Sequence, residues 1–221
     1  MSALGEGVRG SAGGSAERGV HDDVRRRILA GELTPGTRLA ELELATRYAV
    51  SRPTARAAIA SLVETRLLER APHSAARVAS LGADDIRDVY RTREVIESGA
   101  IAQLAASRLV PSAVVAAERE IDALTDASPA DIVDPDMRFH QALVAAIGSP
   151  RIQRAYDELA DEMRLCMTHA QRAALLPTAL IAAEHAEILA RIAAGDADGA
   201  VSAVRGHLAR ACDRLVAHAG A

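Results

Sequence analysis

The second half of the chain reads as a succession of helical segments. From Asp84 almost to the last residue, apolar side chains recur at the three- and four-residue spacing of amphipathic helices. Turn-forming residues interrupt this pattern and delimit about six helices. The interruptions lie near Pro111, near Ser128 and Pro129, from Gly148 to Pro150, near Pro177, and at Gly195 and Asp196. We therefore predict a mainly α protein whose larger part is an all-helical antiparallel bundle.

The composition agrees with a helical fold. Hydrophobic residues make up 49% of the 221 residues, whereas aromatic residues make up 2%. A core of Ala, Leu, Ile and Val suits closely packed helices better than a strand-rich sandwich. The two cysteines, Cys166 and Cys212, are too few for a disulfide framework and lack the spacing of a zinc motif. We expect them to be small core residues in a cytoplasmic protein.

Charge is distributed unevenly along the chain. Residues 1–80 contain 12 Arg and 9 acidic residues, a net charge of +3, whereas residues 81–221 contain 14 Arg and 21 acidic residues, a net charge of −7. A basic front joined to an acidic back can mark nucleic-acid binding at one end.

Residues 1–19 are rich in Gly, Ser, Ala and Arg and are expected to form a disordered head. Because no segment approaches 18 uninterrupted apolar residues, no membrane span is expected.

The front of the chain predicts a winged helix-turn-helix domain over residues 20–80. A first helix begins at Val20 and ends at Gly31, a Pro-Gly turn follows, and residues 41–50 form a short second helix. Ser51 can cap a third helix with the sequence RPTARAAIASLVE. Two short extended runs on either side of residues 72–75 predict a β-hairpin. The connection at residues 80–83 is the expected domain boundary, and the helical domain covers residues 84–218.

The start of this third helix carries candidate DNA contacts. Arg52 and Arg56 are four residues apart, so both guanidinium groups can face the DNA, one toward a phosphate and one toward a guanine edge. The hydroxyl groups of Ser51 and Thr54 could contact the DNA backbone. The alternative is that both arginines are solvated at an exposed helix start.

Four residues of the helical part could ligate a metal ion. Asp136 and His140 are four residues apart, and His185 and His207 each lie in a helix of their own, flanked by inward-facing apolar residues. Buried imidazoles are costly without partners, and a divalent transition metal would satisfy three imidazoles and a carboxylate together. Taken alone, Asp136 and His140 could equally form a hydrogen bond or ion pair on a helix surface.

The front of the chain resembles the N-terminal winged helix of the GntR family. The run from ILAGELTPGTRLAELELATRYAVSR to ARVA contains the PG-x-R-L turn, the Glu-Leu-Ala helix and the SR-x-x-x-R-x-A pattern of that family. Arg38, Arg52, Thr54 and Arg56 match the positions that usually contact DNA. The chain departs from the family at three points. The usual order Thr-Pro is reversed at residues 53–54, and Arg66 and Ala75 replace two glycines, which weighs against wing contacts in the minor groove.

Residues 84–218 are similar to the FCD effector domain of FadR-like GntR regulators. That domain carries D-x-x-x-H on one helix and a single His on each of the last two helices, and Asp136, His140, His185 and His207 fall on these positions. The resemblance implies one divalent transition metal per chain, zinc or nickel, with open positions for a small carboxylate effector. Arg93 of the RTREVIE segment matches an effector-binding Arg, although Arg93 and Glu97 could equally form a structural ion pair.

The resemblance implies a transcription regulator and not an enzyme. Its members bind double-stranded operator DNA as homodimers, and we expect a repressor, although no residue reveals which arrangement binds DNA. Two alternatives remain open at this point. The metal could itself be the signal or be purely structural. A metal-dependent enzyme would explain only the helical part, where we find no nucleophile elbow or phosphate loop.

Overall fold

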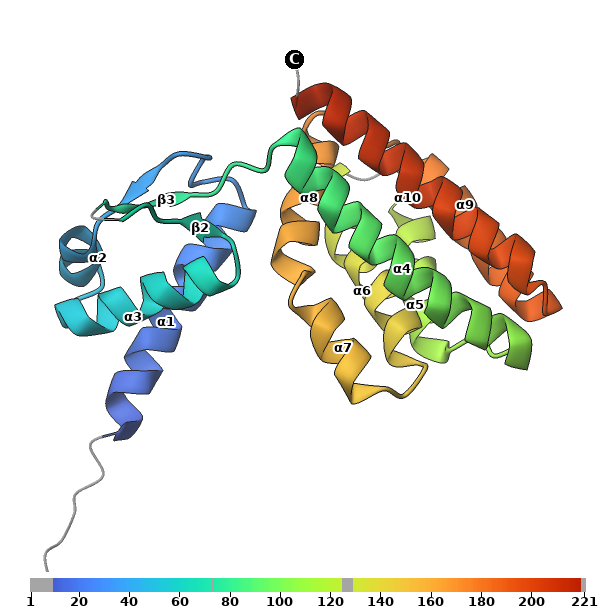
Figure 1. Ribbon diagram of the computed structural model, residues 1–221, viewed down its shortest axis with the longest axis horizontal. Coiled ribbons are helices and arrows are strands. Elements are labelled where there is room, and N and C mark those ends of the chain that lie inside the picture. The colour runs from blue at the N-terminus through green and yellow to red at the C-terminus, as the bar shows by residue number, and fades with distance from the viewer. Residues whose placement is uncertain (1–9, 73, 125–128, 220–221) are drawn as a thin grey trace, which may run out of the picture. The chain divides into compact units, whose positions relative to one another are not determined.

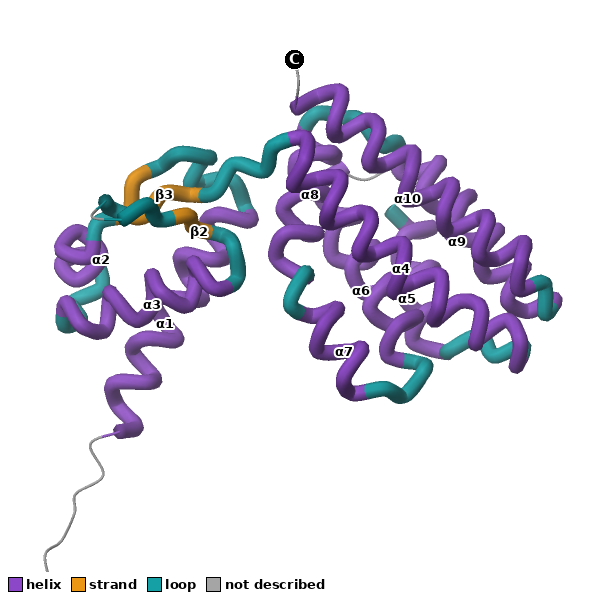
Figure 2. The backbone as a smooth tube through the Cα atoms, viewed as in Figure 1, coloured by secondary structure: helices purple, strands orange, loops and turns teal. Residues whose placement is uncertain are grey.

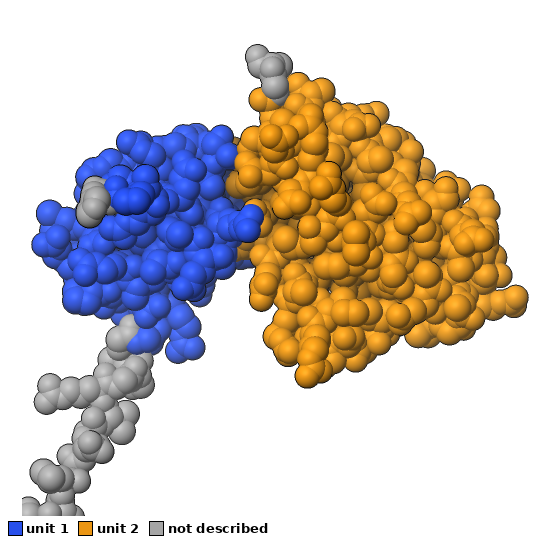
Figure 3. Space-filling model, viewed as in Figure 1, with its two compact units in different colours: residues 1–80 blue, residues 81–221 orange. Residues whose placement is uncertain are grey.

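The computed structural model describes residues 10–72, 74–124 and 129–219. The chain forms two compact units, Met1–Ser80 and Leu81–Ala221, which are shown in blue and orange in Figure 3. Each unit is described below by itself.

The first unit is a winged helix-turn-helix (Figures 1 and 2). It contains the helices α1 (Gly10–Leu29), α2 (Glu41–Arg47) and α3 (Arg52–Glu64), and the strands β1 (Arg38–Leu39), β2 (Leu68–Glu69) and β3 (Ala76–Val78). The strands form an antiparallel sheet in the order β1-β3-β2. The predicted hairpin is present as β2 and β3, and β1 is an additional strand that the sequence did not predict.

Helix α1 begins earlier than the sequence predicted. Residues 10–19 were expected to be part of a disordered head but are helical, and residues 1–9 lie outside the described residues. The buried side chains of Val20, Val24 and Ile28 anchor the helix in the core of this unit. Once a helix is nucleated, adding residues to its end costs little, which explains why a segment without apolar periodicity extends it.

Helix α3 begins at the predicted cap. The Ser51 Oγ accepts a hydrogen bond from the Thr54 backbone N–H at 3.2 Å, and Pro53 lies in the first turn, where no intrahelical donor is lost. Its buried residues are Ala55, Ala58, Ile59 and Leu62, spaced as one face of a helix. Two residues beyond its last residue, Arg66 has a φ of +57°, so the backbone of this residue adopts the left-handed conformation that glycine adopts without cost.

The second unit is a helical bundle, which confirms the mainly α prediction. It contains α4 (Ala83–Ser107), α5 (Ser112–Ala123), a short 3-10 turn (Pro129–Ile132), α6 (Val133–Ala145), α7 (Pro150–Asp157), α8 (Ala160–Arg172), α9 (Thr178–Ala194) and α10 (Ala197–Ala219). The described residues thus form seven α-helices where about six were predicted, and the break predicted near Ser128 falls partly outside them. The extra break separates α7 from α8 at Glu158 and Leu159, which keep right-handed helical dihedrals. Such a bend leaves no Pro or Gly signal in the sequence.

The helices of this unit pack around one apolar core. Helix α10 runs beside α4 (Figure 1), α9 packs against α10, and α5 packs against α6. Apolar residues from these helices form one continuous core, which includes Ile101, Phe139, Leu143 and Ile188. Among the residues that the structure describes, no single helix has the length and apolarity to cross a membrane, although the sharply bent pair α4 and α5 meets those two criteria jointly.

Candidate metal centre and nucleic-acid interface

The four predicted metal ligands meet in the interior of the second unit. Asp136 and His140 lie on α6, His185 on α9 and His207 on α10, and all four side chains are buried. One potential ligand atom from each residue lies within 4.8 Å of those of the other three. The Asp136 Oδ1 lies 3.8 Å from the His140 Nε2 and 3.6 Å from the His185 Nε2. The i,i+4 spacing on α6 therefore places both side chains at one point, as the sequence suggested.

Each imidazole turns its Nδ1 atom toward a glutamate. The His140 Nδ1 lies 2.7 Å from the Glu97 Oε2, and the His207 Nδ1 lies 2.7 Å from the Glu184 Oε2. The His185 Nδ1 lies 3.2 Å from the Glu118 Oε2, but neither atom has hydrogen-bond geometry. A carboxylate facing Nδ1 favours the proton there and leaves the Nε2 lone pair free, which is the usual arrangement behind a metal-binding histidine.

These residues fit a divalent transition metal. The Nε2 atoms of His140 and His185 are buried and have no hydrogen-bond partner among the described residues. A buried polar atom without a partner costs about 1–3 kcal/mol, and a cation that accepts both lone pairs would remove that cost. Three imidazole nitrogens and one carboxylate oxygen are donors that suit zinc, nickel, copper and iron. A single Phe ring, that of Phe139, stacks on His185 with a centroid distance of 3.7 Å and holds that imidazole in place.

The electrostatics keep the imidazoles of His185 and His207 neutral. Burial and the neighbouring His207 and His140 hold the pKa of His185 well below its ordinary value. Burial also lowers the pKa of His207, against the opposing effect of the hydrogen bond that His207 donates to Glu184. Burial raises the pKa of Glu118 to about 7, with smaller contributions from neighbouring Asp residues. Neutral imidazoles offer their lone pairs to a metal without first losing a proton.

Arg93 forms the ion pair that the sequence left as one of two alternatives. The Arg93 Nε donates to the Glu97 Oε1 at 2.9 Å, and the Tyr156 hydroxyl donates to the same oxygen at 2.7 Å. Burial disfavours the ionised Glu97, but the charge of Arg93, together with the hydrogen bonds from His140 and Tyr156, outweighs it and holds the Glu97 pKa well below its usual range. The Arg93 Nη2 is buried and has no hydrogen-bond partner among the described residues. One donor of this guanidinium therefore remains available for a further acceptor.

The five predicted DNA-contacting residues lie in the first unit, and three of them, Arg38, Arg52 and Arg56, line one groove. Four arginines line it together with residues of β1, α2, α3 and β3, and it encloses about 450 Å³. Arg52 is exposed and has no ion-pair partner among the described residues, whereas Arg38 contacts Glu43 at 3.1 Å. Ser51 and Thr54 share a hydrogen bond of 2.8 Å between their hydroxyl groups. Arg56 makes a bidentate ion pair with Glu41 at 3.0 Å, so its guanidinium is held and not merely solvated.

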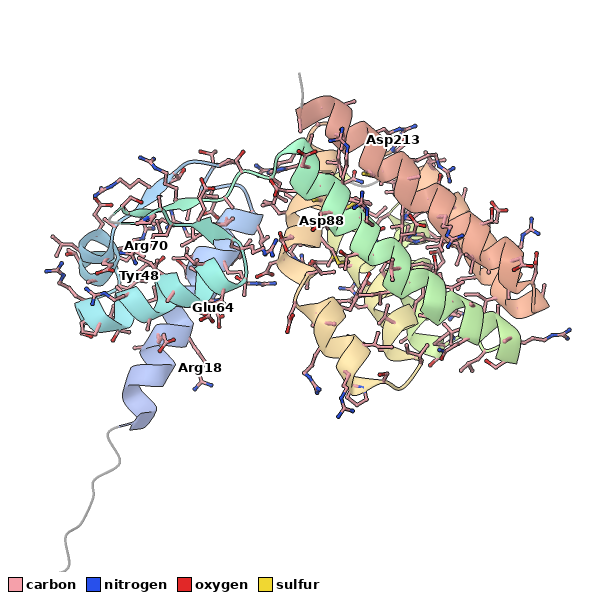
Figure 4. The ribbon with its side chains drawn as sticks, in the orientation of Figure 1. Arg18, Tyr48, Glu64, Arg70, Asp88 and Asp213 are labelled. Atoms are coloured by element: carbon pink, nitrogen blue, oxygen red, sulfur yellow. The ribbon has the colours of Figure 1, made fainter. Side chains whose placement is uncertain are left out.

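Several residues of these two sites were not identified from the sequence. Glu41 and Arg70 belong to the groove, and Arg70 lies beside the sheet on the side of α2 (Figure 4). Glu118, Glu184 and Tyr156 surround the candidate metal centre. Each makes a contact with a residue distant in sequence, so no spacing pattern could have identified it.

Comparisons with known proteins match both units to regulatory families. The FCD domain model covers residues 88–210, and the model for bacterial regulatory proteins of the gntR family covers residues 16–78. The uncharacterized HTH-type transcriptional regulator BphR of Paraburkholderia xenovorans is 28% identical over 198 residues, which are 84% of this chain and 79% of that protein. A crystal structure of a GntR transcriptional regulator from Rhodococcus sp. RHA1 is 25% identical, with a TM-score of 0.79 over 92% of this chain and 98% of that one.

A third similarity concerns the helical unit alone. A Zn²⁺-bound FCD domain of the regulator TM0439 shares its fold, with a TM-score of 0.53 and 22% identity over 62% of this chain and 96% of that one. The families and relatives that match are transcriptional regulators, not enzymes. The FCD match alone spans more than half of the chain. This protein therefore belongs to the GntR family of bacterial regulatory proteins and carries a C-terminal FCD domain.

Proposed function

We propose that this GntR-family regulator binds an operator as a homodimer and that a small carboxylate bound at a divalent transition metal modulates its affinity for DNA. The observation that carries the proposal is the buried group of Asp136, His140, His185 and His207. The Nε2 atoms of His140 and His185 have no hydrogen-bond partner in the part of the chain that the structure describes, and each imidazole has a glutamate facing its Nδ1 atom. A cluster that was only structural would be expected to use those nitrogens in hydrogen bonds.

The four side chains would hold the metal, with zinc or nickel as the ion. Zinc is supported by the FCD domain of TM0439, which is described as Zn²⁺-bound. A bound divalent ion supplies a Lewis acid with positions open to a carboxylate oxygen. The glutamates behind the imidazoles would orient them toward the metal, and the lowered pKa values of His185 and His207 leave these two rings neutral at neutral pH.

Arg93 is the residue we assign to the effector. Its Nε is committed to Glu97, and its buried Nη2 has no acceptor among the described residues. A carboxylate that binds the metal with one oxygen would have a charged donor for the other. Because Glu97 also contacts His140, effector binding at Arg93 would act on the same hydrogen-bond network as the metal.

The groove of the first unit is the proposed DNA-reading surface. Arg52, at the first turn of α3, and Arg56, one turn later, would contact the DNA from the recognition helix. The Ser51 and Thr54 hydroxyl groups and Arg38 on β1 would contact the backbone. A homodimer would present two such surfaces to a palindromic operator.

Fluorescence anisotropy tests the proposal on DNA from upstream of the protein's own gene, with a scrambled duplex as the control. The regulator should bind the native fragment at least about a thousandfold more tightly, with affinity falling steeply as salt rises. The titration is repeated in chelator, in Zn²⁺, and in Zn²⁺ with a series of hydroxy and dicarboxylic acids. A shift caused by metal alone would replace the effector model with metal sensing. Equal weak binding to both duplexes, followed by failure of a genomic-fragment selection, would refute operator binding.

A further inference from the structure

Glu41 holds two arginines from different elements of the DNA-reading unit. It is the first residue of α2, and its side chain is 13% exposed. Its carboxylate accepts from the Arg56 Nε and Nη2 at 3.0 Å each, and from the Arg70 Nη2 at 3.2 Å. Arg56 belongs to the recognition helix α3, and Arg70 follows β2 in the wing. One carboxylate thus ties α2, the recognition helix and the wing together.

Both arginines keep donors free on the groove side of this contact. The Arg56 and Arg70 side chains are 63% and 40% exposed, although each guanidinium is fixed by two donors. Arg70 uses its Nε on the Ser74 carbonyl oxygen at 3.1 Å, so its position is set from the wing turn as well as from Glu41. A guanidinium has five N–H donors, so each of these groups can still donate to a phosphate or a base.

The groove remains positive despite Glu41. Its lining contains Arg38, Arg52, Arg56 and Arg70 against one carboxylate, which gives a formal charge of 4 − 1 = +3. The hydrogen bond from Arg56 holds the pKa of Glu41 below its usual range, against the effect of burial, so this carboxylate is ionised at neutral pH. At the wing, Ala75 stands in the lining where a glycine would allow the backbone to approach DNA closely. The long side chain of Arg70 can reach a phosphate that the backbone at Ala75 does not approach closely.

We propose that Arg70 is a phosphate contact from the wing and that Glu41 is a positioning residue that fixes Arg70 and Arg56 at one separation across the groove. The inference rests on the proposed DNA-binding function and adds two residues to it. A preset pair of guanidinium groups loses less side-chain freedom on binding DNA than two mobile arginines would.

The salt dependence of binding tests Arg70 without knowledge of the operator. The wild-type protein, Arg70→Gln and the control Arg47→Gln are titrated onto one random-sequence duplex at several salt concentrations. Arg47 lies in the last turn of α2, over the Tyr48 ring, and is not part of the groove lining. Arg70→Gln should lower the slope of log K against log salt by about 0.9 per bound chain, while Arg47→Gln leaves it unchanged. An Arg70→Gln slope equal to that of the wild type would overturn the phosphate contact.

Selection from a random pool of duplexes tests Glu41. Glu41→Gln keeps the size of the side chain but weakens its hold on both guanidinium groups, and Glu69→Gln removes the same charge from an exposed position on β2. Glu41→Gln should bind the random duplex at least as tightly as the wild type, because a negative charge has left the groove. Its selected motif should lose base preference at two or more positions, whereas Glu69→Gln selects the wild-type motif.

The outcomes of these experiments separate the two proposals. If Glu41→Gln selects the wild-type motif with equal enrichment, Glu41 has no positioning role. If the wild-type protein shows no salt-dependent binding to any duplex, the proposed DNA-binding function fails and this inference fails with it. Circular dichroism and thermal unfolding of each variant identify any loss of affinity that reflects unfolding.

Discussion

Replacing His185 with Leu should affect stability differently in the absence and presence of metal. The His185 ring is fully buried, and neither of its nitrogens has a hydrogen-bond partner among the described residues. Each unsatisfied nitrogen costs about 1–3 kcal/mol, and Leu removes both. The variant loses the stacking on Phe139, worth about 0.5–1.5 kcal/mol, and fits the site less well by about 1–3 kcal/mol. The midpoints of these ranges give a gain of about 4 and a loss of about 3 kcal/mol, so in chelator the free energy of unfolding should rise by about 1 kcal/mol.

Metal should reverse this comparison. A ligand that binds only the folded state at 100 times its dissociation constant stabilises by about 2.7 kcal/mol. The variant lacks one of the four proposed ligands, so metal should stabilise it much less than the wild type. The stability of His185→Leu relative to the wild type should thus fall by about 2–3 kcal/mol when Zn²⁺ replaces the chelator.

Urea denaturation in EDTA and in buffered Zn²⁺ measures both differences. Ile188→Val, one turn further along α9 and also fully buried, is the matched control and should cost about 0.5–1.5 kcal/mol in both buffers. If His185→Leu is destabilised by the same amount in EDTA and in Zn²⁺, His185 is a core residue and not a metal ligand.

Three further changes test the local chemistry in the metal-free protein. The pKa of Glu118 is raised to about 7, so the folded state holds a proton that the unfolded carboxyl releases at lower pH, and the free energy of unfolding falls as pH rises through 7. Urea denaturation should therefore find Glu118→Gln more stable than the wild type by about 1–3 kcal/mol at pH 8, and by much less at pH 5. Ala49 has a φ of +50°, so Ala49→Gly should raise the free energy of unfolding by about 1 kcal/mol. Ala60→Gly, on the exposed face of α3, should lower the free energy of unfolding by a similar amount, and a change of the same sign in both variants would contradict this reasoning. Gly195 has a φ of +76°, and a Cβ there would lie 2.7 Å from the Arg108 Nε, so thermal unfolding of Gly195→Ala should report a loss of about 1–2 kcal/mol.

Local patterns predicted the features that depend on neighbouring residues. The bounds of α3 follow from the Ser51 cap and the spacing of its apolar face, and the helix in the structure begins and ends at the predicted residues. The convergence of Asp136 and His140 follows from the pitch of a helix. The Pro and Gly residues predicted most of the helix boundaries in the bundle, because their own backbone properties interrupt a helix without any tertiary contact.

Features that depend on tertiary packing had no such signal. The glutamates behind the imidazoles come from α4, α5 and α9, and each faces a histidine on another helix. The pairing of Glu41 with Arg56 spans 15 residues and depends on how α2 packs against α3. The bend at Glu158 keeps helical dihedrals, so no residue type marks it. The helical start of α1 depends on the buried anchor that follows it.

The metal content of the purified protein tests the central claim most directly. The wild type and the double variant His140→Ala, His207→Ala are dialysed against buffered Zn²⁺, then against metal-free buffer, and are analysed by inductively coupled plasma mass spectrometry. Four buried ligand atoms within 4.8 Å of one another predict about one equivalent of metal per wild-type chain and almost none in the variant. A folded wild-type protein without metal, or a variant that retains a full equivalent, would contradict the assignment of this site.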